Sequence, residues 1–79
     1  MTPAVRMYSR PRCGLCDEAR GVILAERSRT SFAFEEVDVT GDEALELEYG
    51  LRIPVVLVNG EERFEIRVEA RAFADAIRS

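Results

Sequence analysis

Two cysteines stand in the arrangement Cys13-Gly14-Leu15-Cys16, the single Cys-x-x-Cys of this 79-residue chain. Thiols at this spacing can form a local disulfide, and a thiolate can attack the disulfide of another molecule. The chain contains no His, which excludes an imidazole base, a Cys-His nucleophile pair and a His-ligated metal site. Any chemistry therefore falls to cysteine, arginine, tyrosine, carboxylates or the backbone.

The cysteine pair lies between a predicted strand and a predicted helix. Alternating apolar and polar side chains predict a strand over residues 5–9, and an apolar stripe predicts an amphipathic helix over residues 14–29. The stripe consists of Leu15, Ala19, Val22 and Ile23. Cys13 then precedes the helix, where unpaired N–H groups and the positive end of the helix dipole favour a thiolate. We predict that Cys13 attacks a substrate and that Cys16, in the first turn and less exposed, resolves the product.

The helix end is not sufficient by itself to activate Cys13. Lowering a thiol pKa by about two units takes about 2.7 kcal/mol, whereas a helix end contributes about 0.3 to 2 kcal/mol. The predicted additions are hydrogen bonds from the N–H groups of Leu15 and Cys16, and the positive charges of Arg10 and Arg12. Arg10 and Arg12 are therefore candidate substrate-binding residues beside the nucleophile.

The middle of the chain predicts a second strand and a short helix. The strand covers residues 32–39, but Phe32 and Phe34 alternate differently from Val37 and Val39, so either a bulge or a late start is expected. The short helix is capped by residue 40 or 42 and runs through residue 49. Gly50 follows where a left-handed residue is favoured.

The last third predicts a hairpin and a final helix. Residues 55–58 are uniformly apolar, which indicates a buried strand, and Asn59-Gly60 predicts a type I′ turn into a fourth strand over residues 63–66. An apolar stripe at helical spacing follows, formed by Ala70, Phe73, Ala74 and Ile77. The order βαβαββα predicts an α/β fold, with a mixed four-stranded sheet and helices on both faces.

Length and composition bound the function. Residues 1–79 suffice for a single domain, and 47% hydrophobic with 33% charged residues is typical of a globular chain. Eleven Lys and Arg against fifteen Asp and Glu give a net charge of −4, which argues against nucleic acid or anionic membrane as a partner. No signal peptide or membrane span is recognised, so we expect a cytoplasmic monomer.

The chain resembles the glutaredoxin branch of the thioredoxin fold over nearly all of its length. The resemblance rests on residues 7–16, 34–39 and 49–56 and on Asn59-Gly60. In particular, it looks like a small glutaredoxin-like group in which a Leu precedes the second Cys, as Leu15 precedes Cys16. The resemblance implies a sheet with strand order 2-1-3-4.

The resemblance also implies roles for particular residues. It implies dithiol exchange through Cys13 and a cis Ile53-Pro54 bond, with the backbone of Ile53 pairing with an extended substrate. Arg10 stands where glutaredoxins usually carry a Lys that meets a glutathione carboxylate, and Arg52 could assist because a guanidinium binds carboxylates bidentately. The family's Gly-Gly-acidic segment, which receives the glutamyl end of glutathione, is replaced by residues 64–70, which contain no Gly.

These observations predict a thiol-disulfide oxidoreductase that reduces protein or glutathione mixed disulfides through Cys13 and Cys16. The expected partners are a disulfide-containing protein or glutathione, and a thiol reductant or reductase. We expect no tightly bound cofactor and no metal, with glutathione as a candidate co-substrate. The alternatives are an iron-sulfur or metal carrier, in which a dimer completes the ligand set, and a catalytically idle interaction domain with an acidic surface.

Overall fold

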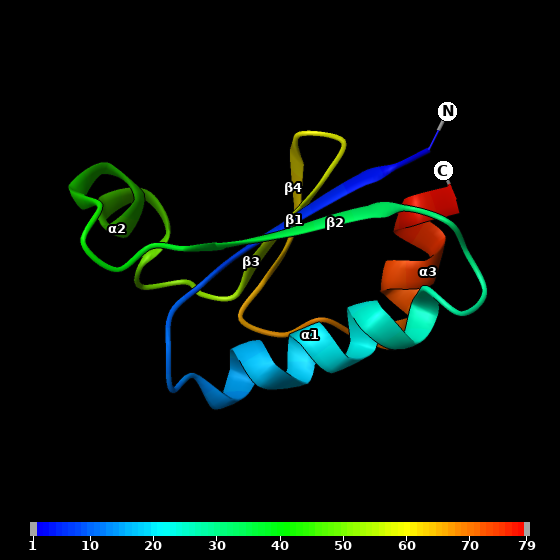
Figure 1. Ribbon diagram of the computed structural model, residues 1–79, viewed down its shortest axis with the longest axis horizontal. Helices are drawn as coiled ribbons and strands as arrows, with labels where there is room; N and C mark the ends of the chain where they lie inside the picture. The colour runs from blue at the N-terminus through cyan, green and yellow to red at the C-terminus, as the bar shows by residue number, and fades with distance from the viewer. Residues whose placement is uncertain (1, 79) are drawn as a thin grey trace.

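The computed structural model describes residues 2–78 and contains three helices and four strands within that range (Figure 1). In chain order they are β1 (Ala4–Ser9), α1 (Gly14–Glu26), β2 (Ala33–Asp38), α2 (Glu43–Tyr49), β3 (Val55–Val58), β4 (Glu61–Glu65) and α3 (Ala70–Arg78). The predicted order βαβαββα is therefore confirmed.

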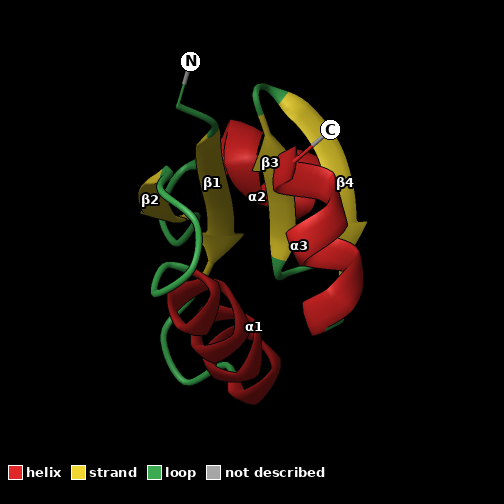
Figure 2. Cartoon of the chain, turned by 90° about the vertical axis from the view of Figure 1, so that its right-hand side faces the viewer, coloured by secondary structure: helices red, strands yellow, loops and turns green. Residues whose placement is uncertain are grey.

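The four strands form one mixed sheet in the order β2-β1-β3-β4, as expected. β1 pairs with β2 in parallel, while β3 is antiparallel to both β1 and β4. Asn59 and Gly60 connect β3 to β4 with φ angles of 52° and 81°, the pair of positive values that a type I′ turn requires. Figure 2 shows α3 in front of β3 and α2 behind the sheet, so helices cover both faces.

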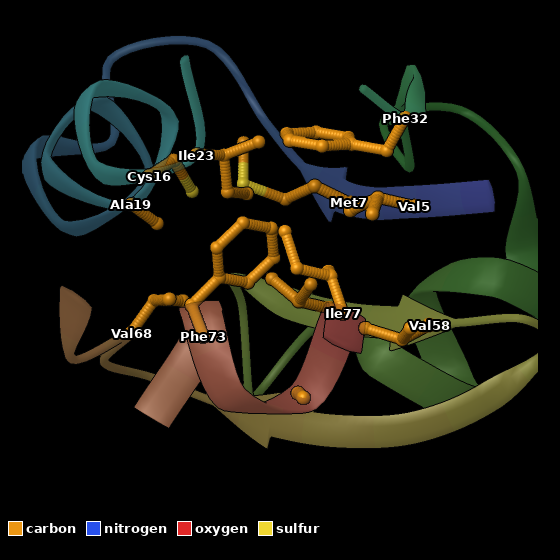
Figure 3. Close-up of a cluster of buried hydrophobic side chains, with 12 residues drawn as sticks. Val5, Met7, Cys16, Ala19, Ile23, Phe32, Val58, Val68, Phe73 and Ile77 are labelled. Atoms are coloured by element: carbon orange, nitrogen blue, oxygen red, sulfur yellow. The ribbon is translucent and has the colours of Figure 1, made fainter. Parts of the chain in front are cut away.

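The larger core lies between the sheet and the pair α1 and α3 (Figure 3). Met7 of β1, Ile23 of α1 and Phe73 of α3 are fully buried there, and Cys16 is in the same cluster. A smaller cluster on the opposite face contains Tyr8 and packs against α2. The two clusters fix both sides of β1, the strand that leads into the Cys-x-x-Cys segment.

The alternation in β2 needs neither a bulge nor a late start, which corrects the expectation from the sequence. β2 pairs with β1 in unbroken register, from Ala4 opposite Ala33 to Ser9 opposite Asp38. Phe32 and Phe34 pack into the larger core, while Val37 and Val39 pack into the smaller one. The strand is apolar toward opposite faces at its two ends. The irregularity lies between β3 and β4 instead, at Val56 and Leu57.

Gly50 is not left-handed as predicted, since its φ of −54° and ψ of −34° are helical. A Cβ at this position would lie 2.5 Å from the carbonyl oxygen of Glu46 and 3.0 Å from Nη2 of Arg10. Glycine is therefore needed for close approach and not for backbone freedom. Of the two caps predicted for α2, residues 40 and 42, the structure has Asp42, whose side chain accepts the N–H of Leu45 at 3.1 Å.

Several element ends differ from the sequence prediction: β1 starts one residue earlier, β2 is one residue shorter at each end, and α1 and β4 differ more. α1 stops at Glu26 and not at residue 29, because the next N–H groups bond three residues back, from Arg27 to Leu24 and from Ser28 to Ala25. β4 spans residues 61–65 and ends before Ile66, whose φ of 69° cannot continue a strand. Within residues 2–78, none of the helices has the length and apolar character needed to cross a membrane.

Candidate active site

The Cys-x-x-Cys segment joins the loop after β1 to the first turn of α1. Cys13 is the N-cap of α1, with extended backbone angles of −115° and 105°, and its Sγ accepts the N–H of Cys16 at 3.1 Å. Cys13 and Cys16 are joined in a disulfide, with their Cα atoms 5.2 Å apart. The sequence predicted hydrogen bonds to this sulfur from the N–H groups of Leu15 and Cys16, and the structure shows the one from Cys16.

The two sulfurs differ in accessibility. Cys13 is half-buried, whereas Cys16 is 0% exposed. In Figure 3 the side chain of Cys16 points from α1 toward the core beside Ile23. An incoming molecule can therefore meet the sulfur of Cys13 but not that of Cys16. Burial thus divides the pair into an accessible and an inaccessible sulfur.

The two arginines before Cys13 have different surroundings. Arg10 reaches across to α2, where its Nη2 donates to Oε1 of Glu46 at 3.0 Å and to the carbonyl of Gly50 at 3.3 Å. Its Nε is buried without a hydrogen-bond partner in residues 2–78. Arg12 is exposed, has a left-handed φ of 58° and makes no ion pair within the described chain. Arg12 is thus the less constrained cation beside Cys13.

Arg52 is held by acidic side chains around it. Its Nη1 donates to Glu62 at 2.8 Å and to Glu65 at 3.1 Å, and its guanidinium lies 5.7 Å from the centre of the Tyr49 ring. The hydrogen bonds that Arg52 donates to Glu62 and Glu65 raise the pKa of Arg52 above its usual range, and the Arg52 guanidinium lowers the pKa of Glu62. A substrate carboxylate would have to displace one of these partners to bind Arg52.

The Ile53-Pro54 segment presents backbone groups without internal partners. The peptide bond is cis, as the resemblance implied, and Pro54 is fully buried. The carbonyls on either side of Ile53, those of Arg52 and Pro54, both accept the N–H of Ile66, at 3.1 and 2.8 Å. Within residues 2–78 the N–H and C=O of Ile53 itself make no hydrogen bond. They are free to pair with an extended chain.

A charged cluster behind the loop was not foreseen from the sequence. Arg20 of α1 binds Glu36 of β2 through two nitrogens, at 2.7 and 2.6 Å, and also binds Asp17 at 2.8 Å. Ser9, which is buried, donates its hydroxyl to Glu36 at 2.7 Å. The Arg20 hydrogen bonds, followed by that of Ser9, lower the pKa of Glu36. This network ties the end of β1 and the start of α1 to β2.

A shallow groove was also missed. It has a volume of about 240 Å³ and runs between α1 and the segment that joins β4 to α3. Its apolar walls are Leu15 and Val22 on one side and Ile66 and Val68 on the other. The predicted helix stripe included Leu15, but the structure buries Cys16 and leaves Leu15 half-buried. That small rotation of the stripe places Leu15 at the surface.

In the described part of the chain, the acidic side chains and the cysteines are not grouped as metal ligands. Among residues 2–78, no group of three or more Cys, Asp or Glu side chains is arranged to hold a metal ion. The oxygen atoms near the loop are engaged with arginines, as those of Glu36 and Glu46 show. The groups available for chemistry in the described site are therefore the two sulfurs, the backbone amides and the guanidinium groups.

The fold and the site together define an α/β protein of the thioredoxin-like kind with a Cys-x-x-Cys disulfide at the start of its first helix. The sequence profile of the glutaredoxin-like domain family (DUF836) matches residues 4–78. The chain therefore belongs to this family. An uncharacterized protein of Mycobacterium tuberculosis is 34% identical over 83 aligned positions, covering 98% of this chain and 86% of that protein.

Solved structures agree with this placement. Protein XcR50 from X. campestris is 31% identical, with a TM-score of 0.78 over 94% of this chain and 95% of that one. A mutant thioredoxin from Halobacterium salinarum is 26% identical, with a TM-score of 0.67 over 96% of this chain and 72% of that one. The thioredoxin-like fold and the Cys13–Cys16 disulfide suggest a redox role.

Proposed function

We propose that this protein is a thiol-disulfide oxidoreductase that reduces protein or glutathione mixed disulfides through Cys13 and Cys16. The observation that carries the proposal is the position of the Cys13 sulfur: it is half-buried at the amino end of α1 and accepts the N–H of Cys16. Such a position stabilises a thiolate, which is the attacking form. Burial keeps Cys16 from competing for the substrate.

The proposed reaction begins with the reduced protein. The Cys13 thiolate attacks one sulfur of the substrate disulfide, a mixed disulfide forms, and the other substrate sulfur leaves as a thiolate. Cys16 then loses its proton and attacks the sulfur of Cys13, which releases the second substrate thiol. Two electrons have passed from the protein to the substrate, and the protein holds the disulfide seen in the structure. A thiol reductant or reductase must then reduce this disulfide to regenerate the dithiol. A reducing compartment such as the cytoplasm would supply that reductant.

Substrate positioning is proposed for the groups around the sulfur. The unpaired N–H and C=O of Ile53, next to Pro54, would form two hydrogen bonds with an extended substrate backbone. Arg12 supplies an exposed positive charge next to the nucleophile. Arg10 and Arg52 would take part through exchange of their present carboxylate partners, Glu46 and Glu62 respectively.

Two single variants test the proposal. Cys13→Ser should lower the rate of insulin or hydroxyethyl-disulfide reduction to that of the assay without protein. Cys16→Ser should stop dithiol turnover but accumulate a mixed disulfide on Cys13, visible as added mass under non-reducing conditions. Reduction at an unchanged rate by Cys13→Ser would show that the proposed nucleophile is wrong.

A further inference from the structure

One wall residue of the groove beside the cysteine pair, Ile66, has a strained backbone conformation. Ile66 has a φ of 69°, and a β-branched residue in this left-handed region is a genuine outlier that glycine would relieve. Core packing does not account for an isoleucine here, because its side chain is 41% exposed. Its N–H bonds to Arg52 and Pro54 would be available to any residue except proline. What isoleucine adds is therefore the apolar wall of the groove.

The groove begins at the Cys-x-x-Cys segment, through Leu15. Leu15, which stands between the two cysteines, forms one wall, and Ile66, bonded to the carbonyls that flank Ile53, forms the other. Figure 3 shows Val68, another wall residue, below α1 and facing Ala19. A substrate joined to Cys13 and paired with Ile53 would carry the residues next to its own cysteine toward this groove.

The volume of the groove and the charges at its rim limit the kinds of molecule that it can bind. The volume of about 240 Å³ is below the range of about 300 to 1,000 Å³ typical of sites for whole small molecules. The rim carries Glu18 and Glu69 against Arg67, whose Nη1 lies 3.8 Å from Glu18. The Glu69 carboxylate also accepts the N–H groups of Arg71 and Ala72 at 3.3 and 3.0 Å, so it occupies amides at the start of α3 that an anion would use.

From these features we propose that the groove receives an apolar side chain adjacent to the reacting cysteine of an extended polypeptide, with Ile66 as a specificity-determining residue. The proposal rests on the proposed oxidoreductase function and selects polypeptide disulfides over glutathione disulfides. Glutathione carries two carboxylates and one ammonium group and has no apolar side chain. It would bring net negative charge to a rim with more carboxylates than cations and leave the apolar walls uncovered.

The test compares neutral, end-capped peptides that differ only beside their cysteine. Ala-Leu-Cys-Leu-Ala, Ala-Ser-Cys-Ser-Ala and glutathione are each joined to thionitrobenzoate through a disulfide and mixed with the fully reduced protein. Cys13 attacks the peptide sulfur and thionitrobenzoate leaves, so the coloured anion reports the rate constant. The leucine peptide should react at least about tenfold faster than the serine peptide, the scale of discrimination by an apolar pocket. Glutathione should also be slower than the leucine peptide.

Variants on the two walls test the role of the side chains. Ile66→Gly allows the left-handed backbone and removes the wall, and Val22→Ser alters the opposite wall without touching the β4–α3 segment. Each should reduce the ratio of leucine to serine rate constants to within about threefold. Leu24→Ala is the matched control, since Leu24 is 44% exposed on α1 and lies outside the groove. The ratio of leucine to serine rate constants for Leu24→Ala should equal that of the unmodified protein. Thermal melting checks that each variant folds.

The outcomes separate the two proposals. Equal rates for the two peptides, a ratio that survives both wall variants, or glutathione as the fastest substrate would each overturn the groove assignment while leaving oxidoreductase activity intact. No thionitrobenzoate release by Cys13 from any of the three probes would instead refute the oxidoreductase function itself.

Discussion

The two cysteines should differ sharply in reactivity once their disulfide is reduced. The perturbation is a short exposure of the reduced protein to iodoacetamide at neutral pH. Cys13 stands half-buried at a helix end, while Cys16 is 0% exposed and packs in one cluster with Met7, Ile23 and Phe73. Alkylation of Cys16 therefore requires its side chain to leave the core first.

The magnitude follows from these two environments. Bringing a buried apolar side chain to the surface costs about 1.5 to 3 kcal/mol, which slows Cys16 by about 10- to 150-fold. Thiolate stabilisation at the helix end increases the reactive fraction of Cys13, but lower nucleophilicity offsets most of this gain and leaves about a few-fold. Cys13 should thus be alkylated on the order of 10² times faster than Cys16.

Peptide mass spectrometry after a timed quench measures both rates in one sample. The same experiment in about 6 M guanidinium chloride is the control, because unfolding removes both environments and should bring the rates together. Similar rates in the folded protein, or faster alkylation of Cys16, would refute the assignment of Cys13 as the accessible nucleophile.

Three further predictions concern the surroundings of the site. Gly21→Ala should raise the free energy of unfolding by about 0.8 to 1 kcal/mol in urea titration, because Gly21 is an exposed residue within α1 and an added Cβ meets nothing within 4 Å. Arg20→Met should lower that free energy by about 1 kcal/mol at neutral pH, since Arg20 binds Glu36 through two hydrogen bonds. The pKa of Glu36 is lowered in the folded state, so the loss should be complete above the usual value of 4.5 and disappear as pH falls through the folded pKa. Arg12→Gln should slow alkylation of Cys13 by about twofold at low salt, and by less at about 1 M salt, because Arg12 is an exposed charge.

Each of these has a contradicting result. Destabilisation by Gly21→Ala would mean that the helix surface there is packed by a partner. A stability loss in Arg20→Met that persists at acidic pH would assign the effect to packing of the arginine stem and not to the ion pair. A salt-independent effect of Arg12→Gln would point to a local backbone change at its left-handed φ angle.

The sequence predicted the parts of the fold that depend on short-range patterns. The apolar run over residues 55–58, the Asn59-Gly60 turn and the helix after Cys13 are each specified by neighbours in the chain, and the structure has them at those positions. The strand order followed from the resemblance. By contrast, regular alternation along β2 turns Phe34 and Val37 to opposite faces, and the local sequence could not show that a core covers each of those faces.

The parts of the site that escaped prediction depend on distant residues. Arg10 was expected to await a substrate carboxylate, but Glu46 of α2 is within 3.0 Å of it. Arg52 similarly meets Glu62 of β4 at 2.8 Å. Nothing in the local sequence marks Ile66 as left-handed, because the angle accompanies the hydrogen bonds of its N–H to Arg52 and Pro54.

The outer strands of the sheet bear on how the protein behaves at high concentration. β2 and β4 form the two edges, and an unpaired edge strand can recruit a strand from another copy. Both edges are acidic, with Glu35, Glu36 and Asp38 on β2 and Glu61, Glu62 and Glu65 on β4. Repulsion between the carboxylates of two copies opposes pairing of their edge strands. Some of the same carboxylates also form ion pairs with Arg20 and Arg52. Acidification would therefore weaken the internal ion pairs and neutralise the carboxylates of both edges together.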